Sequence, residues 1–232
     1  MNSRQIVTIG TVLRRTDFQE ADRILTLLTP DQGKVRVLAK GVRRAKSKLA
    51  GGIELLSISD ITYIPGRGEL GTLISARMLT YYDAIVTNLA RTMLAYDFIK
   101  IINKITEDPA GEEYFNLIKL ALTGLNDLEL SKNLVELWFS MQLLKITGHE
   151  PNLSTDKTGK KFESNLDYLF SFDDMAFEVR KDGPHSANLI KLLRLAYATD
   201  NPLVLGNIQK TEDLADAAVS LIKPLIQSAF GL

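Results

Sequence analysis

The sequence predicts an α+β protein in two parts, a small closed β-barrel in residues 1–80 followed by an α-helical region in residues 81–232. Short runs rich in β-branched residues, separated by Pro and Gly, occupy the first part. In the second part, apolar residues recur at steps of three and four, as on the buried face of a helix. The net charge of zero hides an asymmetry, because residues 1–80 hold 13 Lys and Arg against 7 Asp and Glu. A basic segment of this kind favours an acidic partner such as nucleic acid.

Five strands are expected, at residues 6–13, 23–28, 34–39, 57–64 and 70–76. The turns at 29–33 and 65–68 contain Pro and Gly, which supply turn geometry. Five short strands joined in this way fit the OB-fold, a five-stranded barrel. Its nucleic-acid face is formed by strands 2 and 3 and by the loops that join strands 1–2 and 4–5.

The basic residues fall where such a barrel would bind nucleic acid. Arg14 and Arg15 are expected to open the first loop, Lys34 and Arg36 to share one face of the third strand, and Arg67 to lie in the loop between strands 4 and 5. A flexible segment without any acid follows the third strand and carries Lys40, Arg43, Arg44, Lys46 and Lys48. Cations spaced along a groove bind phosphate oxygens without reading base sequence.

Aromatic residues are sparse in the first part, so base stacking is expected to contribute little. Phe18 and Tyr63 are the two aromatic residues before Tyr81. Phe18 is expected to anchor the first loop in the barrel mouth, with base stacking as the alternative role.

Helices are expected at residues 84–105, 112–125, 130–146 and 187–198, and a last one is expected to begin at Thr211. Residues 149–183 form an irregular insert, too long for a simple connector. Within it, Phe170 and Phe172 could pair with residues 175–179 across a turn at Asp173 and Asp174.

Composition excludes several function classes. The chain has no cysteine and two histidines, so disulfides, thiolate nucleophiles and Cys-ligated metals are excluded and a histidine-rich metal site is not expected. No apolar run approaches the length of a membrane span, and the first residues do not resemble a signal peptide. His149 lacks the second histidine of a zinc-protease helix. We therefore expect a cytoplasmic protein that is not an enzyme.

Two stretches of the first part resemble the RecO family of bacterial recombination mediators. They are residues 11–25, Thr-Val-Leu-Arg-Arg-Thr-Asp-Phe-Gln-Glu-Ala-Asp-Arg-Ile-Leu, and residues 33–44, Gly-Lys-Val-Arg-Val-Leu-Ala-Lys-Gly-Val-Arg-Arg. A third match is Gly148 followed by Pro151-Asn152-Leu153. The resemblance covers most of the chain in order, although the C-terminal part matches the family only in being helical.

This resemblance implies an N-terminal OB domain, a helical domain and a role in DNA repair. Proteins of the family bind single- and double-stranded DNA and anneal complementary strands. They act with RecR and with the C-terminal tail of the single-stranded DNA-binding protein to load RecA. The DNA contacts carried over from the matched stretches are Arg14, Arg15, Lys34, Arg36, Lys40, Arg43 and Arg44. Lys46, Lys48 and Arg67 are added from the barrel geometry alone.

The chain departs from the family after the third match. Many RecO proteins carry a four-cysteine zinc module there, whereas residues 154–161 read Ser-Thr-Asp-Lys-Thr-Gly-Lys-Lys. We expect no zinc or other cofactor, and an insert held instead by the aromatic side chains Phe162, Tyr168, Phe170, Phe172 and Phe177.

Two alternative functions stay open at the level of sequence. An RNA-binding OB protein of translation or RNA processing would show the same electrostatics. A protein–protein adaptor would instead use the acidic helical part, where residues 81–232 hold 15 Lys and Arg against 21 Asp and Glu.

Overall fold

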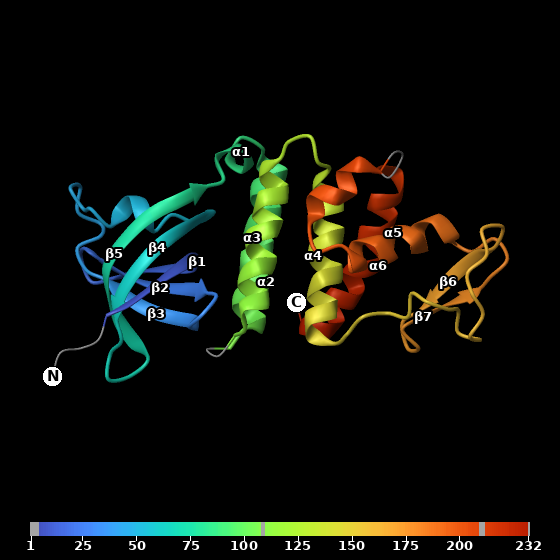
Figure 1. The fold of residues 1–232 in the computed structure, drawn as a ribbon, viewed down its shortest axis with the longest axis horizontal. Helices are drawn as coiled ribbons and strands as arrows, with labels where there is room; N and C mark the ends of the chain where they lie inside the picture. Colours follow the sequence, from blue (N-terminus) through green and yellow to red (C-terminus); the bar gives the residue numbers. More distant parts are fainter. Residues whose placement is uncertain (1–4, 108–109, 209–211, 232) are drawn as a thin grey trace. The chain divides into compact units, whose positions relative to one another are not determined.

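A computed structural model describes residues 5–107, 110–208 and 212–231 of the chain (Figure 1). Contacts within it divide the chain into a first unit, residues 1–126, and a second unit, residues 127–232. The change from strands to helices comes near residue 81, as predicted, but the first helices belong with the barrel. A barrel domain that ends at residue 80 and a helical domain with its insert at 149–183 stay a prediction.

The first unit opens with a closed five-stranded barrel, which confirms the predicted OB-like architecture. Its strands are β1 (Ile6–Phe18), β2 (Asp22–Thr29), β3 (Gly33–Ala39), β4 (Ser57–Ile64) and β5 (Leu70–Tyr81). They follow the order β1-β2-β3-β5-β4, and β1 also pairs with β4 to close the barrel. β3 and β5 run parallel, whereas the other neighbours are antiparallel.

Alternation along the strands builds the barrel core. Leu25 and Leu27 of β2 and Val37 of β3 point inward and are fully buried. Val12 of β1 and Leu73 of β5 complete this core from the neighbouring strands. Each strand thereby leaves its other face for solvent or for the helices of the same unit.

The prediction that Arg14, Arg15 and Phe18 lie in the first loop is wrong. β1 continues to Phe18, and the turn is confined to residues 19–21. The polar stretch is unlike a buried strand because this part of the hairpin is mostly exposed. Backbone pairing with β2, from Arg14 opposite Thr26 to Phe18 opposite Asp22, keeps it extended all the same.

Three helices complete the first unit: α1 (Asp83–Val86), α2 (Leu89–Ile105) and α3 (Glu112–Asn126). The single helix predicted over 84–105 is thus divided near residue 88. Asn88 is the N-cap of α2, because its side-chain oxygen accepts a hydrogen bond from the Arg91 amide at 3.2 Å.

The second unit packs α4 (Lys132–Thr147), α5 (Ala187–Ala198) and α6 (Glu212–Phe230) around a buried core. Trp138 of α4 is 1% exposed and its indole N–H donates to the Thr199 carbonyl at 2.9 Å. Gly148 ends α4 with φ 71°, a left-handed conformation that favours glycine. The predicted capping residue Thr211 lies outside the described residues.

The insert forms a small sheet, with β6 (Asp167–Ser171) flanked by β7 (Ala176–Val179) and β8 (His185–Ser186). The predicted hairpin is present, although Phe172 lies in its turn rather than in a strand. The aromatic side chains of the insert meet edge to face, Phe162 with Tyr168 and Phe170 with Phe177. None of the helices in the described residues is long and apolar enough to cross a membrane.

Candidate nucleic-acid interface

The outer face of the β1–β2–β3 sheet presents two arginines in one row. Thr26 of β2 lies opposite Arg14 of β1 and opposite Arg36 of β3. Directly paired residues point to the same face, and two strand spacings separate the arginines by about 10 Å. Both arginines are exposed, so this row offers two guanidinium groups to a ligand lying across the strands.

The next rows on the same face carry apolar side chains. Ile24 lies between Thr16 and Leu38, and beyond it Phe18 lies opposite Asp22. Phe18 is 39% exposed and shares the outer face with Arg14, so its ring is open to solvent. An exposed aromatic ring beside cations suits base stacking better than the anchoring role expected from the sequence.

Lys34, also on the outer face, is engaged by the first unit's own helices. Its ammonium donates to the carbonyl oxygens of Asn103 at 3.1 Å and Thr106 at 2.5 Å, at the C-terminal end of α2. The last carbonyls of a helix lack intrahelical partners and carry partial negative charge, so a cation is favourable there. Lys34 therefore joins β3 to α2, and its role as a DNA contact stays a prediction.

The basic segment after β3 is held against the β1–β2 turn, in contrast to the flexible segment expected. The Gly41 amide donates to Asp22 Oδ1 at 2.7 Å, and the Arg43 amide donates to the Ala21 carbonyl at 2.9 Å. Gly41 has φ +63°, which glycine adopts without strain. A depression of about 530 Å³ opens here, and its lining includes Lys40 and Arg44.

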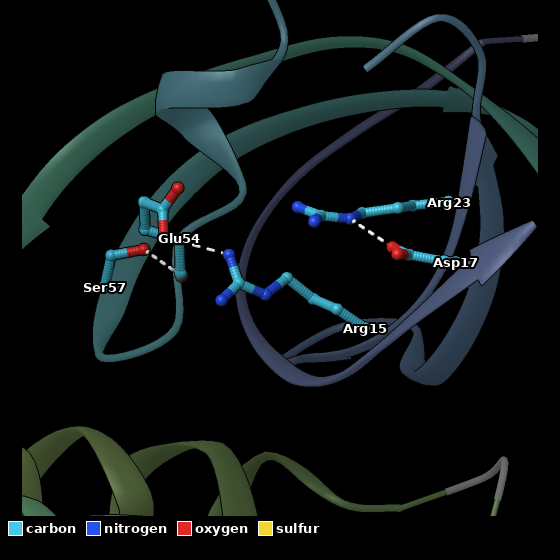
Figure 2. A network of polar contacts seen from close by, with 5 residues as sticks. All are labelled: Arg15, Asp17, Arg23, Glu54 and Ser57. Carbon is cyan, nitrogen blue, oxygen red and sulfur yellow. Dashed lines mark hydrogen bonds and ion pairs between the residues drawn. The ribbon is translucent and has the colours of Figure 1, made fainter. Parts of the chain in front are cut away.

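Arg15, one of the predicted cations, and the neighbouring Arg23 pair with carboxylates on the inner side of the β1–β2 hairpin (Figure 2). Arg15 donates to Glu54 at 2.9 Å, and Arg23 donates to Asp17 at 2.8 Å. Arg43 lies 3.6 Å from the second oxygen of the same aspartate. The hydrogen bond from Arg23, supported by the nearby arginine charges, lowers the pKa of Asp17.

Two groups of predicted cations emerge from this arrangement. Arg14 and Arg36 share a row, and Arg36 lies opposite Leu70 at the start of β5, next to the loop that carries Arg67. At the other end of β3, Lys40 and Arg44 line the depression beside the β1–β2 turn. Within the described part of the chain, no carboxylate lies within 4 Å of seven of the ten: Arg14, Lys34, Lys40, Arg44, Lys46, Lys48 and Arg67.

Sequence reasoning missed the carboxylates that engage the other cations. Glu69 lies 3.7 Å from Arg36, just before β5. Glu54 precedes β4, 39 positions away from its partner Arg15. Local spacing carries no signal for such a pair, whereas the period-two alternation of Arg14, Thr16 and Phe18 could have shown that they share a face.

Among the described residues, no candidate metal site competes with this interpretation. The described residues contain no group of three or more His, Cys, Asp and Glu that could hold a metal ion. Without cysteine the chain cannot form the four-cysteine zinc module either.

Comparison with known proteins places the chain among recombination proteins. Residues 1–82 match the family model described as the N-terminal domain of recombination protein O. A DNA repair protein RecO of Listeria monocytogenes serotype 4a is 27% identical over 220 residues, 90% of this chain and 85% of the relative. Another RecO, of Dehalococcoides mccartyi strain CBDB1, is 31% identical over 163 residues, 69% of this chain and 64% of the relative. The RecO of Heliobacterium modesticaldum is 33% identical over 144 residues, 62% and 51% respectively.

Proposed function

We propose that this chain, which belongs to the RecO family, binds single- and double-stranded DNA on the outer face of its barrel and anneals complementary strands. It is a DNA repair and recombination protein and not an enzyme. The observation that carries the proposal is the row in which the exposed Arg14 and Arg36 flank Thr26 on a closed OB-like barrel.

The ten predicted cations divide by what they must give up to bind DNA. Seven have no carboxylate within 4 Å, and six of these, all except Lys34, can meet phosphates directly. Arg15, Arg36 and Arg43 must first exchange a carboxylate oxygen for a phosphate oxygen, and Lys34 must leave two carbonyls. Because exposed ion pairs are weak, this exchange costs little for Arg36 and Arg43, whose pairs are also the longest.

The partners follow from family membership. We propose that the chain acts with RecR and with the C-terminal tail of the single-stranded DNA-binding protein, and so helps to load RecA onto coated DNA.

The test is the salt dependence of binding to a labelled single strand and to a duplex of the same sequence. If about five phosphates are contacted, log affinity against log salt should have slopes near −3.5 and −4.5 respectively. The variant Arg14→Ala/Arg36→Ala should flatten the single-strand slope by about 1.4. Arg180→Ala, an exposed arginine of the second unit, is the matched control.

Two results would contradict the proposal. An unchanged slope in the Arg14→Ala/Arg36→Ala variant would remove this row from the interface. Stronger binding of an RNA strand than of the DNA strand of the same sequence would favour a role in RNA metabolism.

A further inference from the structure

A cationic cavity of about 270 Å³ lies within the second unit, between the insert and α5. One wall is lined by Ala187, Lys191 and Arg194 of α5. Successive members of this set are four and three positions apart, so they share a helical face. The insert supplies the opposite wall, and the side chains there are Ser154, Lys161 and Phe162. The described residues that line the cavity thus bring three positive charges together and include no acid.

Arg194 is fixed in this wall. Its Nε and Nη2 both donate to the Leu153 carbonyl, at 3.0 and 2.7 Å, which ties the insert to α5. Its guanidinium carbon lies 5.8 Å from the centre of the Phe162 ring. The other guanidinium nitrogen, Nη1, carries two further N–H donors for a ligand.

The two lysines are less constrained than Arg194. Lys191 Nζ donates to Asn188 Oδ1 at 3.5 Å, a long and therefore weak hydrogen bond. In the described chain Lys161 has no carboxylate within 4 Å. Lys157, by contrast, is paired with Asp174 at 2.5 Å, so the lysines of the insert differ in their surroundings.

The lining favours a phosphate with part of its nucleotide. Cations and a hydroxyl suit phosphate oxygens, and an aromatic ring at the same place suits a base. Phe162 is held by edge contacts with Tyr168 at 5.2 Å and Phe177 at 6.0 Å between ring centres. The volume is below the range typical of small-molecule pockets, about 300–1,000 Å³, so one unit of a longer polymer fits better than a separate metabolite.

We infer that this cavity holds a phosphate of a second nucleic-acid strand while the outer face of the barrel holds the first. The inference rests on the proposed annealing function, because annealing requires that two strands be bound by the same assembly. The second unit is then a binding site in its own right, although residues 127–232 carry more acids than bases.

The test compares the unmodified chain with the variant Lys161→Ala/Lys191→Ala. The probes are a fluorescein-labelled single strand without self-complementarity, titrated to saturation, and its complement for annealing. We expect the variant to bind one strand per chain in place of two and to anneal about tenfold more slowly. At low salt, where residual binding of the second strand can still be measured, its salt slope should be shallower by about 1.4, the value for two lost phosphate contacts.

The control variant, Lys181→Ala/Lys223→Ala, removes two exposed lysines of the same unit that do not line the cavity. It should bind two strands and anneal at the rate of the unmodified chain. Fluorescence of Trp138, buried in this unit, reports whether each variant folds. If Lys161→Ala/Lys191→Ala does not fold, the variant Lys161→Gln/Lys191→Gln is tested in its place.

Three outcomes would overturn the inference. Two bound strands with the original salt slope in Lys161→Ala/Lys191→Ala would show that the cavity holds no strand. One strand per unmodified chain would do the same. An Asp-rich peptide serves as a further probe. If the Lys161→Ala/Lys191→Ala variant no longer binds this peptide but still binds two strands, the cavity belongs to an acidic protein segment. Failure of the proposed function itself is separate, because it would appear as DNA binding unaffected by Arg14→Ala/Arg36→Ala.

Discussion

Replacing Lys34 by methionine separates a structural role of this residue from a role in DNA binding. The ammonium donates to two carbonyls at the end of α2, whereas the side-chain stem lies next to Leu28, its fully buried partner on β2. Methionine keeps most of the stem and removes the donors. A hydrogen bond from a charged group contributes about 1.5–3 kcal/mol when buried. Because Lys34 is half-buried, we expect Lys34→Met to lower the free energy of unfolding by about 1–2 kcal/mol.

Equilibrium unfolding in urea, followed by far-ultraviolet circular dichroism, measures this loss. For a unit of this size, the same change corresponds to a fall in Tm of about 4–8 °C. Lys48→Met is the matched control, since Lys48 is exposed and, among the described residues, has no carboxylate within 4 Å. That control should change the unfolding free energy by less than about 0.5 kcal/mol but flatten the single-strand salt slope by about 0.7.

The opposite pattern would refute the reasoning. If Lys34→Met unfolds at the same urea concentration as the unmodified chain and flattens the salt slope as Lys48→Met does, the ammonium binds phosphate and not the helix end. The measurement therefore decides the role of one of the ten predicted contacts without depending on the other nine.

Three further predictions concern single positions. Asp17→Asn removes the carboxylate shared by two arginines and should strengthen single-strand binding roughly two- to threefold; the advantage should vanish below pH 3.8, as the lowered pKa of Asp17 is approached and it loses its charge in the unmodified chain. Gly41→Ala forces alanine to φ +63° and should cost about 1–2 kcal/mol in urea unfolding, whereas Gly51→Ala, with open space around its Cβ, should not. The Thr158 hydroxyl donates to Asp156 and lowers the pKa of that carboxyl. The ionised carboxylate therefore stabilises the insert fully above pH 3.8, its unfolded pKa, and this stabilisation is lost as the pH falls through the lower folded pKa. Amide exchange in the insert should accelerate at that low pH, and Asp156→Ala should abolish this pH dependence.

The barrel and most helices could be predicted because local patterns determine them. On β3, the buried Val37 and Ala39 alternate with Arg36 and Leu38, which are exposed or partly exposed, and this alternation indicates both the strand and its inner face. The hairpin beyond Leu13 could not be found in this way, because residues 14–17 of β1 are all polar and their pairing with β2 keeps them extended. The break at Asn88 was also missed, although a capping residue stood there.

The candidate site was predicted as a set of residue types and not as a geometry. A run of cations without acids identifies the basic segment, but the charges that neutralise Arg15 and Arg43 come from Glu54 and Asp17, on other parts of the chain. The helix end that binds Lys34 lies 69 or more positions away. Such partners depend on the tertiary fold, so a sequence pattern cannot show which cations are free.

The contacts that fix the loop of the insert also form the cationic cavity. Asp156 is 4% exposed and accepts hydrogen bonds from the Thr158 hydroxyl at 2.7 Å and from the Thr158 and Lys160 amides at 2.8 and 2.9 Å. A buried carboxylate with several donors holds a loop in one conformation. Arg194 then ties the neighbouring Leu153 carbonyl to α5. With the loop fixed at both points, Lys161 is held facing α5 without cysteine or metal, so loosening either point should also open the cavity and weaken whatever it binds.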